Sequence, residues 1–365
     1  MTTKGNETEK KAVGLRVWAP AKVNLFFEIL FKRDDGFHEI QTVATPIGLC
    51  DELEFLLRNE ENGAEIGETS IVECVDEARK PVPGIPLDDR NLIIRAAKAF
   101  DEAFGEPTPV AIRVVKRIPS QAGLGGGSSD AAATLAALNE LRGRPFSNER
   151  LREIGGRLGS DVPLFLLDGA SVGRSRGEIV EPFDLPEIWL VVLKPTEGLS
   201  TPEVFRQYVA LAPTAKRSLD DFCAAVSTAK RERGMNGENK ADEGNRERGI
   251  SGVNGKESGD CGGVAASVGA SLFNRLEEVA ATIWDGVARY RALLSATEDV
   301  LGVQMSGSGT AFFAIYPSEA AANEAAEALR RKCVDGETIA VARTLRTTFR
   351  FQTLGFPLEG KRERK

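Results

Sequence analysis

Histidine is almost absent from this sequence: His38 is the single one in 365 residues. Mechanisms that need two histidines, such as H-E-x-x-H zinc hydrolysis, are therefore excluded. A Ser-His-Asp hydrolase would have to combine His38 with the serine of the one G-x-S-x-G match, Gly173–Gly177. That serine is followed by a proline-containing segment instead of a helix, and His38 precedes it in the chain. We therefore interpret the match as chance.

Cysteine is also scarce, and no C-x-x-C pair occurs. The cysteines are Cys50, Cys74, Cys223, Cys261 and Cys333. Their wide spacing argues against a zinc knuckle or a redox dithiol and favours reduced thiols in a cytosolic protein. Residues 1–11 are polar and partly acidic, unlike a secretory signal or a typical organelle transit peptide. We therefore expect a cytoplasmic protein.

The sequence lacks both an excess of positive charge and a long apolar run. Lys plus Arg is 47 and Asp plus Glu is 54, which gives a net charge of -7. Proteins that bind polyanions by counterion release normally have a positive excess, and runs such as Ile188–Leu193 are too short to span a bilayer. We expect no nucleic-acid partner and no membrane. A local pocket for one small anion remains possible, because net charge does not describe a single cleft.

The length and the ordinary composition predict two globular domains. Strand-like stretches come first and helix-like stretches follow in the first half, which predicts an α+β fold. Residues 228–262 contain no aromatic residue and almost no large aliphatic one, so they predict a disordered insertion. We prefer a tolerated surface insert to a functional arm. The expected divisions are a disordered tail at 1–13, an N-terminal domain at 14–184, a C-terminal domain at 185–356 and a tail at 357–365.

The most informative motif is a glycine-rich loop that leads directly into a helix. Four of the five residues 123–127 are glycine, so few Cβ atoms keep an anion away from the backbone N–H groups. The Ala- and Leu-rich segment Ser129–Leu141 predicts a helix whose positive end points to the same place. The loop matches neither the Walker A pattern nor the dinucleotide fingerprint, and a flexible linker would not lead into such a helix. It therefore predicts phosphate binding.

This loop, Pro119–Asp130, resembles the signature of the GHMP kinases, the small-molecule kinases of the galactose, homoserine and mevalonate group. Pro20–Leu25 and Met305–Ala311 resemble the other motifs of the family. The resemblance covers about residues 15–350 outside the insertion. It implies a two-domain GHMP kinase fold, with a ribosomal S5 domain 2-like N-terminal domain and a ferredoxin-like C-terminal domain. It also implies ATP and Mg²⁺ as cofactors, and a monomer or homodimer.

Further stretches narrow the resemblance within the family. They are Ala19–Leu25, Arg33–His38, Asn91–Ala97, Gly123–Ala132 and Leu158–Phe165. They are similar to the GHMP kinases that phosphorylate a small molecule, the cytidine diphosphate conjugate of methylerythritol. The implied reaction is at the C2 hydroxyl, in the non-mevalonate route to isoprenoid precursors.

The resemblance implies that Asp161 is the catalytic base and that Lys22 orients the hydroxyl and stabilises charge. Asp161 lies between a Gly-Ser turn and Val-Pro, where the direction of the backbone is fixed. An isolated lysine in an apolar strand, such as Lys22, is costly unless it pairs with an acid or a phosphate. Without the resemblance, we would interpret either residue as an ordinary surface charge.

The remaining site residues also follow from the resemblance. The substrate-binding residues are Asn24, Phe37, His38, Thr201, Phe205 and Gly307. The ATP-binding residues are Asn91, Leu92, Lys116, Pro119, Gly123, Leu124, Gly125, Gly126, Gly127, Ser128 and Ser129, and Ser129 is also the candidate metal ligand. His38 is expected to hydrogen-bond the edge of the cytosine, and the rings of Phe37 and Phe205 are expected to stack on its faces. The family usually has Tyr where Phe37 stands, so a hydroxyl contact is lost.

Simpler interpretations of these residues stay open from the sequence alone. His38 can be a satisfied histidine after a turn, Thr201 a capping residue and Phe205 a core residue. Asn91 can be only a helix start, and Lys116 only a strand end.

Three other functions are also open. Another GHMP kinase would keep the loop and Asp161 but has no need of His38. A non-catalytic GHMP-fold ligand sensor is favoured by loss of Lys22 or Asp161, and both are present. An RNA-binding protein is disfavoured by the net charge.

Overall fold

The computed structural model describes residues 12–58, 69–213, 215–232, 234, 262–333 and 336–356. Most of the expected tails and of the expected insertion lie outside these ranges. Among the described residues, no helix has the length and apolar character needed to cross a bilayer.

The N-terminal half is built on a long hairpin formed by β1 (Ala12–Lys32) and β2 (His38–Leu57). The strands of its sheet follow the order β12-β1-β2-β4-β3. In addition, β8 pairs with β1, β5 pairs with β2, and β6 pairs with β5. The other strands are β3 (Ser70–Val75), β4 (Val110–Val115), β5 (Ser171–Ser175), β6 (Ile179–Pro182), β8 (Phe273–Asn274) and β12 (Arg350–Phe356). All pairs are antiparallel except β3 with β4 and β1 with β8.

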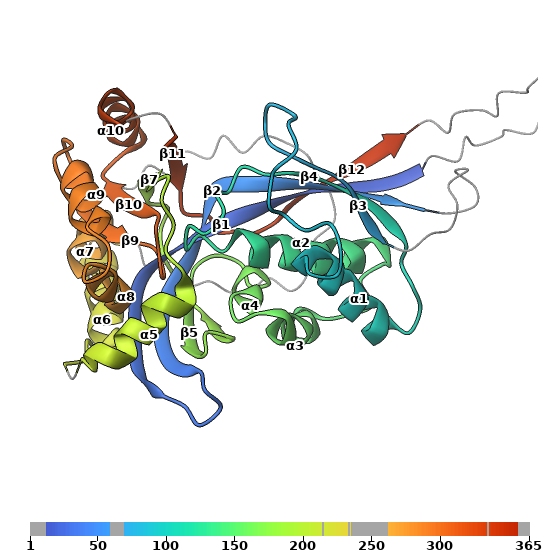
Figure 1. Ribbon diagram of the computed structural model, residues 1–365, viewed down its shortest axis with the longest axis horizontal. Coiled ribbons are helices and arrows are strands. Elements are labelled where there is room, and N and C mark those ends of the chain that lie inside the picture. The colour runs from blue at the N-terminus through green and yellow to red at the C-terminus, as the bar shows by residue number, and fades with distance from the viewer. Residues whose placement is uncertain are drawn as a thin grey trace, which may run out of the picture.

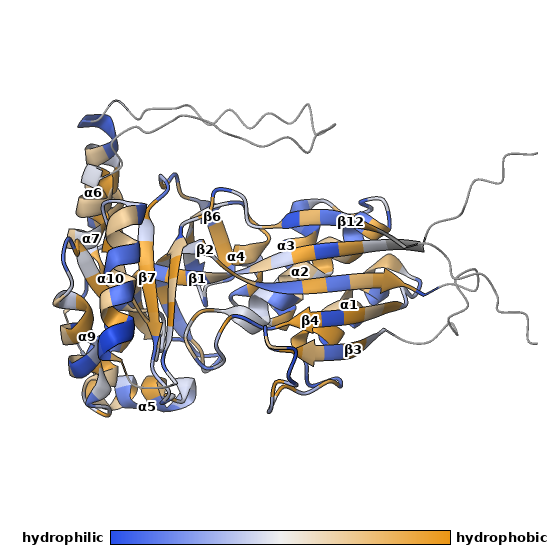
Figure 2. Cartoon of the chain, turned by 90° about the horizontal axis from the view of Figure 1, so that it is seen from above, coloured by the Kyte–Doolittle hydropathy of each residue, from blue (hydrophilic) through white to orange (hydrophobic). Residues whose placement is uncertain are grey.

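Helices cover one face of this sheet (Figure 1). They are α1 (Leu92–Phe104), α2 (Gly126–Leu141), α3 (Asn148–Leu158) and α4 (Val162–Phe165). Side chains alternate across a strand, so Leu53 and Phe55 of β2 join the core beneath the helices. Glu52 and Glu54 point the other way, and the strands seen from above in Figure 2 alternate between polar and apolar accordingly.

The C-terminal half contains a second, antiparallel sheet of order β11-β7-β10-β9. Its strands are β7 (Trp189–Lys194), β9 (Gly302–Met305), β10 (Phe312–Tyr316) and β11 (Thr338–Arg343). Its helices are α5 (Thr201–Leu211), α6 (Leu219–Glu232), α7 (Gly262–Ser271), α8 (Arg275–Ala280), α9 (Gly286–Ser295) and α10 (Glu319–Lys332). The prediction of an α+β architecture in two parts is confirmed.

Both faces of this second sheet are buried, which explains why β7 is a continuous apolar run. Leu190 and Val192 pack in one cluster with α6 and α7. Val191 and Leu193 pack in another with α9 and α10. A strand covered on both faces needs apolar residues at every position instead of at alternate ones.

Three expected boundaries differ from the structure. Residues 12–13 lie in β1 and not in a tail. Residues 228–232 continue α6 and residue 262 begins α7, so the described edges of the expected insertion are helical; 233 and 235–261 lie outside the described residues. Finally, β12 belongs to the N-terminal sheet through seven paired positions with β1. This pairing is non-local, so nothing in the local sequence indicates it.

Candidate functional site

The glycine loop lies against β1 and opens into the N-terminus of α2. Gly125 has a positive φ of 71°, and a Cβ there would lie 3.1 Å from Lys22 Cγ and 3.1 Å from Phe165 Cζ. Glycine is therefore required for this close approach. α2 has no side-chain cap, so the N–H groups of its first turn are available to an anion.

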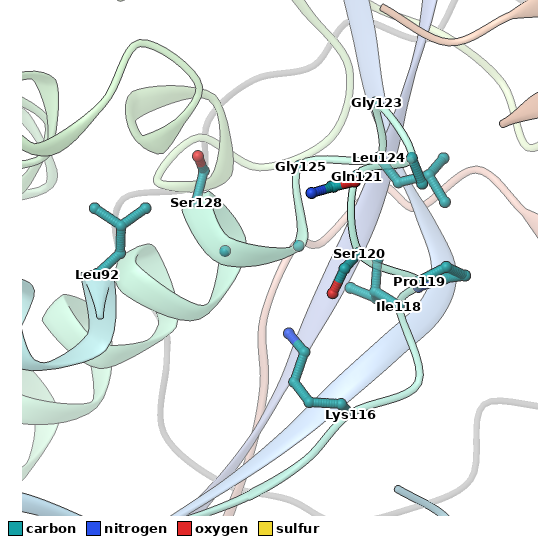
Figure 3. Close-up of a pocket in the computed structure, with 13 residues that line it drawn as sticks. Leu92, Lys116, Ile118, Pro119, Ser120, Gln121, Gly123, Leu124, Gly125 and Ser128 are labelled. Carbon is teal, nitrogen blue, oxygen red and sulfur yellow. The ribbon is translucent and has the colours of Figure 1, made fainter. Parts of the chain in front are cut away.

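Two adjoining cavities lie along this loop. The first, of about 300 Å³, is lined by Leu92, Lys116, Ile118 and the consecutive residues 119–128 (Figure 3). The second, of about 200 Å³, is lined by Cys74, Ile85, Pro86, Arg90, Asn91, Leu92, Ile93, Val114, Lys116, Ser120, Gly127 and Asp130. Every predicted ATP-binding residue except Ser129 lines one of the two.

Asn91 combines a structural role with a place in the second cavity. Its side-chain oxygen accepts a hydrogen bond from the Ile93 N–H at 2.9 Å, which caps α1. Its amide nitrogen donates to the Pro86 carbonyl at 2.7 Å. The helix-start interpretation is therefore correct for Asn91. The residue also lines the second cavity, whose wall includes apolar side chains.

Lys116 lies where the two cavities meet, and its side chain points toward the glycine loop (Figure 3). Its ammonium donates to Asp51 Oδ2 and, at 2.6 Å, to Asp130 Oδ2. Burial works to lower the pKa of Lys116, but the two carboxylates outweigh it and raise the pKa. Burial raises the pKa of Asp130 despite the nearby ammonium, and the charge of Asp51 adds to this rise.

The predicted catalytic pair is brought together at the other end of the loop. Lys22 Nζ lies 3.8 Å from Asp161 Oδ2, and the side chains are 5% and 44% exposed respectively. Lys22 also donates to Asn24 Oδ1 at 2.6 Å. Asn24 in turn donates to Thr42 Oγ1 at 2.9 Å. Asp161 caps α4 without a side-chain hydrogen bond, so its carboxylate faces Lys22 and solvent.

The loop between β9 and β10 closes on the same place from the C-terminal half. A Cβ at Gly307 would lie 3.3 Å from Asn24 Oδ1 and 3.4 Å from Lys22 Nζ. Ser306 Oγ donates to the Gly123 carbonyl at 3.0 Å. The second glycine loop is thus fastened to the first, beside Lys22.

An aromatic group lies at the tip of the β1–β2 hairpin. The ring of His38 is 5.1 Å from that of Phe205 and 5.7 Å from that of Tyr208. Burial, with a contribution from the charge of Lys32, lowers the pKa of His38. Within the described chain, His38 Nε2 is buried without a hydrogen-bond partner. A neutral ring with one free nitrogen can donate to or accept from a ligand.

Phe37 and Thr201 are placed differently. Phe37 is 51% exposed, and its ring contacts the Arg176 guanidinium at 4.9 Å instead of packing in the core. Thr201 is the first residue of α5, and the capping position is Ser200. The Thr201 hydroxyl lies 2.7 Å from Ser308 Oγ, so it connects α5 to the second glycine loop.

Sequence reasoning missed several residues of this region. Tyr208 follows Phe205 by one helical turn, so the i,i+3 spacing could have indicated a shared face. Thr42 and Asp51 carried no local signal, because each acts on a residue of another element.

The candidate metal ligand Ser129 is buried, and its hydroxyl lacks a partner in the described structure. Asp130 Oδ1 is likewise buried and unpartnered there. Over the described residues, no group of three His, Cys, Asp or Glu side chains could hold a metal alone. Hydroxyl and carboxylate oxygens without a protein partner, beside a glycine loop, nevertheless fit Mg²⁺, which takes most of its ligands from phosphates and water.

The chain is similar to known proteins in sequence and in fold. The family models for the N-terminal domain and the C-terminal domain of GHMP kinases match residues 91–169 and 257–335. A protein of Pelotomaculum thermopropionicum named 4-diphosphocytidyl-2-C-methyl-D-erythritol kinase is 36% identical over 327 residues, which are 89% of this chain and 96% of that protein.

A protein of the same name from Marinobacter nauticus is 44% identical over 51% of this chain, and the alignment spans only 61% of that relative. A crystal structure of 4-(cytidine 5'-diphospho)-2C-methyl-D-erythritol kinase superposes with a TM-score of 0.64 at 29% identity. It covers 90% of this chain and 99% of its own. The predicted two-domain fold of this family is thereby confirmed.

Proposed function

Because the chain belongs to the GHMP kinase family, we propose that it transfers the γ-phosphoryl group of ATP to the C2 hydroxyl of 4-diphosphocytidyl-2-C-methyl-D-erythritol. The names of its relatives support this substrate. The observation that carries the proposal is the meeting of Lys22 and Asp161 at one end of a phosphate-type glycine loop.

Asp161 is the proposed base. Its partly exposed carboxylate can accept the proton of an alcohol placed beside it. Lys22 holds that carboxylate close, because its ammonium is buried and has only Asn24 and Asp161 as polar side-chain partners among the described contacts. The same ammonium faces the space in which negative charge develops during transfer.

The glycine loop is the proposed binding site for the phosphates. The free N–H groups at the start of α2 suit phosphate oxygens, and the second cavity, with Leu92, Ile85 and Pro86 in its wall, suits a base. Ser129 and Asp130 are the proposed holders of magnesium, with Ser128 at the cavity wall. When bound, magnesium would neutralise charge on the phosphates.

The His38 group is the proposed site for cytosine. A flat base can stack between aromatic rings, and the free Nε2 of His38 can form a hydrogen bond with the base edge. The Phe205 ring, whose centre lies 5.1 Å from the centre of the His38 ring, can form one wall of this site. Phe37 at the hairpin tip is exposed enough to close over a ligand from the other side.

The test is ATP consumption by the purified protein with Mg²⁺ and the cytidine compound, beside homoserine, mevalonate and galactose. Turnover with the cytidine compound alone is the expected result. Turnover with another alcohol would keep the kinase and reject the cytosine pocket. Nucleotide binding without turnover on any alcohol would favour the ligand sensor.

A further inference from the structure

The carboxylate of Asp51 holds two separate parts of the nucleotide region. Asp51 is fully buried in β2, and its Oδ2 accepts a hydrogen bond from Lys116 Nζ. Its Oδ1 accepts from the backbone N–H groups of Arg117 at 2.6 Å and Ile118 at 2.8 Å. One side chain thus fixes both the ammonium and the backbone that leads into the glycine loop.

This backbone is packed tightly against the loop that follows it. A Cβ at Gly126 would lie 3.0 Å from Ile118 Cγ2 and 3.7 Å from Asp51 Oδ2. A shift of Ile118 would therefore displace Gly126, the first residue of α2. The hydrogen bonds of Asp51 Oδ1 to residues 117 and 118 prevent such a shift.

The ammonium of Lys116 is held by two carboxylates, which do not occupy all of its hydrogen-bond donors. Asp51 and Asp130 take two of its three N–H donors, and no other acceptor is found for it within the part of the chain that the structure describes. Lys116 borders both cavities. One donor therefore remains for a ligand that crosses from one cavity to the other.

We propose that Asp51 is a positioning residue for a nucleoside triphosphate: it aims Lys116 at the junction of the two cavities and fixes the entry to the glycine loop. This inference rests on the proposed use of ATP. Asp51 itself lines neither cavity, so it acts through Lys116 and through the backbone of residues 117–118.

The variant D51N tests this role. Asparagine keeps the size of the side chain and the acceptor for the two N–H groups, but it loses the negative charge that faces Lys116. We expect the Kd of a fluorescent ATP analogue with Mg²⁺, and the KM for ATP, to rise about 10- to 100-fold, which is typical of losing a hydrogen bond to a charged group. We expect kcat to change less than about threefold and the KM for the alcohol to stay constant.

The matched control is E54Q. Glu54 lies three residues further along β2, points to the opposite face and pairs with Arg16 at 3.1 Å. Removing its charge should leave the Kd of the ATP analogue unchanged. A second control uses K116A: if Asp51 acts largely through Lys116, D51N should weaken binding much less in the K116A background than in wild-type protein.

The outcomes separate this proposal from the proposed function. Wild-type protein that binds the ATP analogue but phosphorylates no alcohol refutes the function alone. A folded D51N that binds the analogue like wild-type protein, or that only unfolds at lower urea concentration, overturns the positioning role. If D51N does not fold, D51E retains the charge but displaces the carboxylate, and an unchanged Kd in D51E would overturn the role equally.

Discussion

Gly123 is the point where the two glycine loops press most closely on each other, and Gly123→Ala tests that contact. Gly123 has a φ of +72°, and a Cβ there would lie 2.0 Å from the Ser306 carbonyl oxygen. The left-handed backbone alone costs alanine about 1–2 kcal/mol. Relief of the overlap needs a shift of at least about 1 Å, and overpacking of this kind costs about 1–3 kcal/mol more.

Gly143→Ala is the matched control for this substitution. Gly143 has a φ of +77°, and no atom lies within 4 Å of the position of its Cβ. It follows α2 at the end that lies away from the loop. The control therefore has the backbone cost of about 1–2 kcal/mol without the overlap.

Two measurements distinguish the variants, urea unfolding and steady-state kinetics. Gly143→Ala should lose about 1–2 kcal/mol of unfolding free energy and keep its kcat/KM. Gly123→Ala should lose about 2–5 kcal/mol. It should also lower kcat/KM for ATP about 10- to 100-fold, because a misplacement of about 1 Å in a binding loop is enough for this loss. Equal stability losses, or wild-type kcat/KM in Gly123→Ala, would refute the reasoning.

Four further predictions concern the base, the aromatic group and the contact between the two halves. Asp161→Asn should keep the fold and lower kcat by about two to four orders of magnitude; a loss below about fivefold in a turnover assay would show that Asp161 is not the base. His38→Ala should mainly raise the KM for the cytidine compound, and an unchanged KM would remove His38 from the pocket. The pKa of His38 is lower in the folded protein than in the unfolded chain, so the unfolded chain takes up this proton first as the pH falls. The contribution of neutral His38 to the free energy of unfolding is therefore complete above about pH 6.5 and is lost as the pH falls through the folded pKa. Urea titrations between pH 5 and pH 8 should show a free energy of unfolding that falls with falling pH in wild-type protein and falls less in His38→Ala. Equal pH dependence in the two proteins would contradict this. Arg275→Ala should cost about 3–5 kcal/mol in urea unfolding. It leaves the fully buried Glu28 without the guanidinium that lies 2.7 Å away, although the backbone N–H groups of Ile29 and Arg217 still donate to its carboxylate. A loss below about 1 kcal/mol would contradict this.

The local elements of the site were predictable because their causes are local. Glycines followed by an Ala- and Leu-rich segment predict a glycine loop that leads into a helix, and α2 is that helix, although it begins at Gly126, before the predicted start at Ser129. The apolar run Ile188–Leu193 predicts a strand buried on both faces, and β7 is such a strand. The family resemblance rested on the glycine loop and on other short stretches, such as Pro20–Leu25 and Met305–Ala311.

The boundaries of the larger units were less predictable. β12 joins the N-terminal sheet although it follows the whole C-terminal half in the sequence. The pairing of an edge strand depends on which sheet presents a free edge, and that edge exists only after the rest of the chain has folded. The extension of α6 to Glu232 was missed because its last turn is polar and solvent-exposed, with no apolar periodicity to reveal it.

By itself, the sequence determined which reactive side chains are present, where the glycine loops lie and that a helix follows the first of these loops. Only the tertiary structure decided which groups meet: Lys22 with Asp161, Asp51 with Lys116, and His38 with Phe205. The physical reason is distance along the chain. Backbone conformation follows from neighbouring residues, whereas the contact between two charges or two rings depends on sheets and helices from distant segments packing at fixed positions.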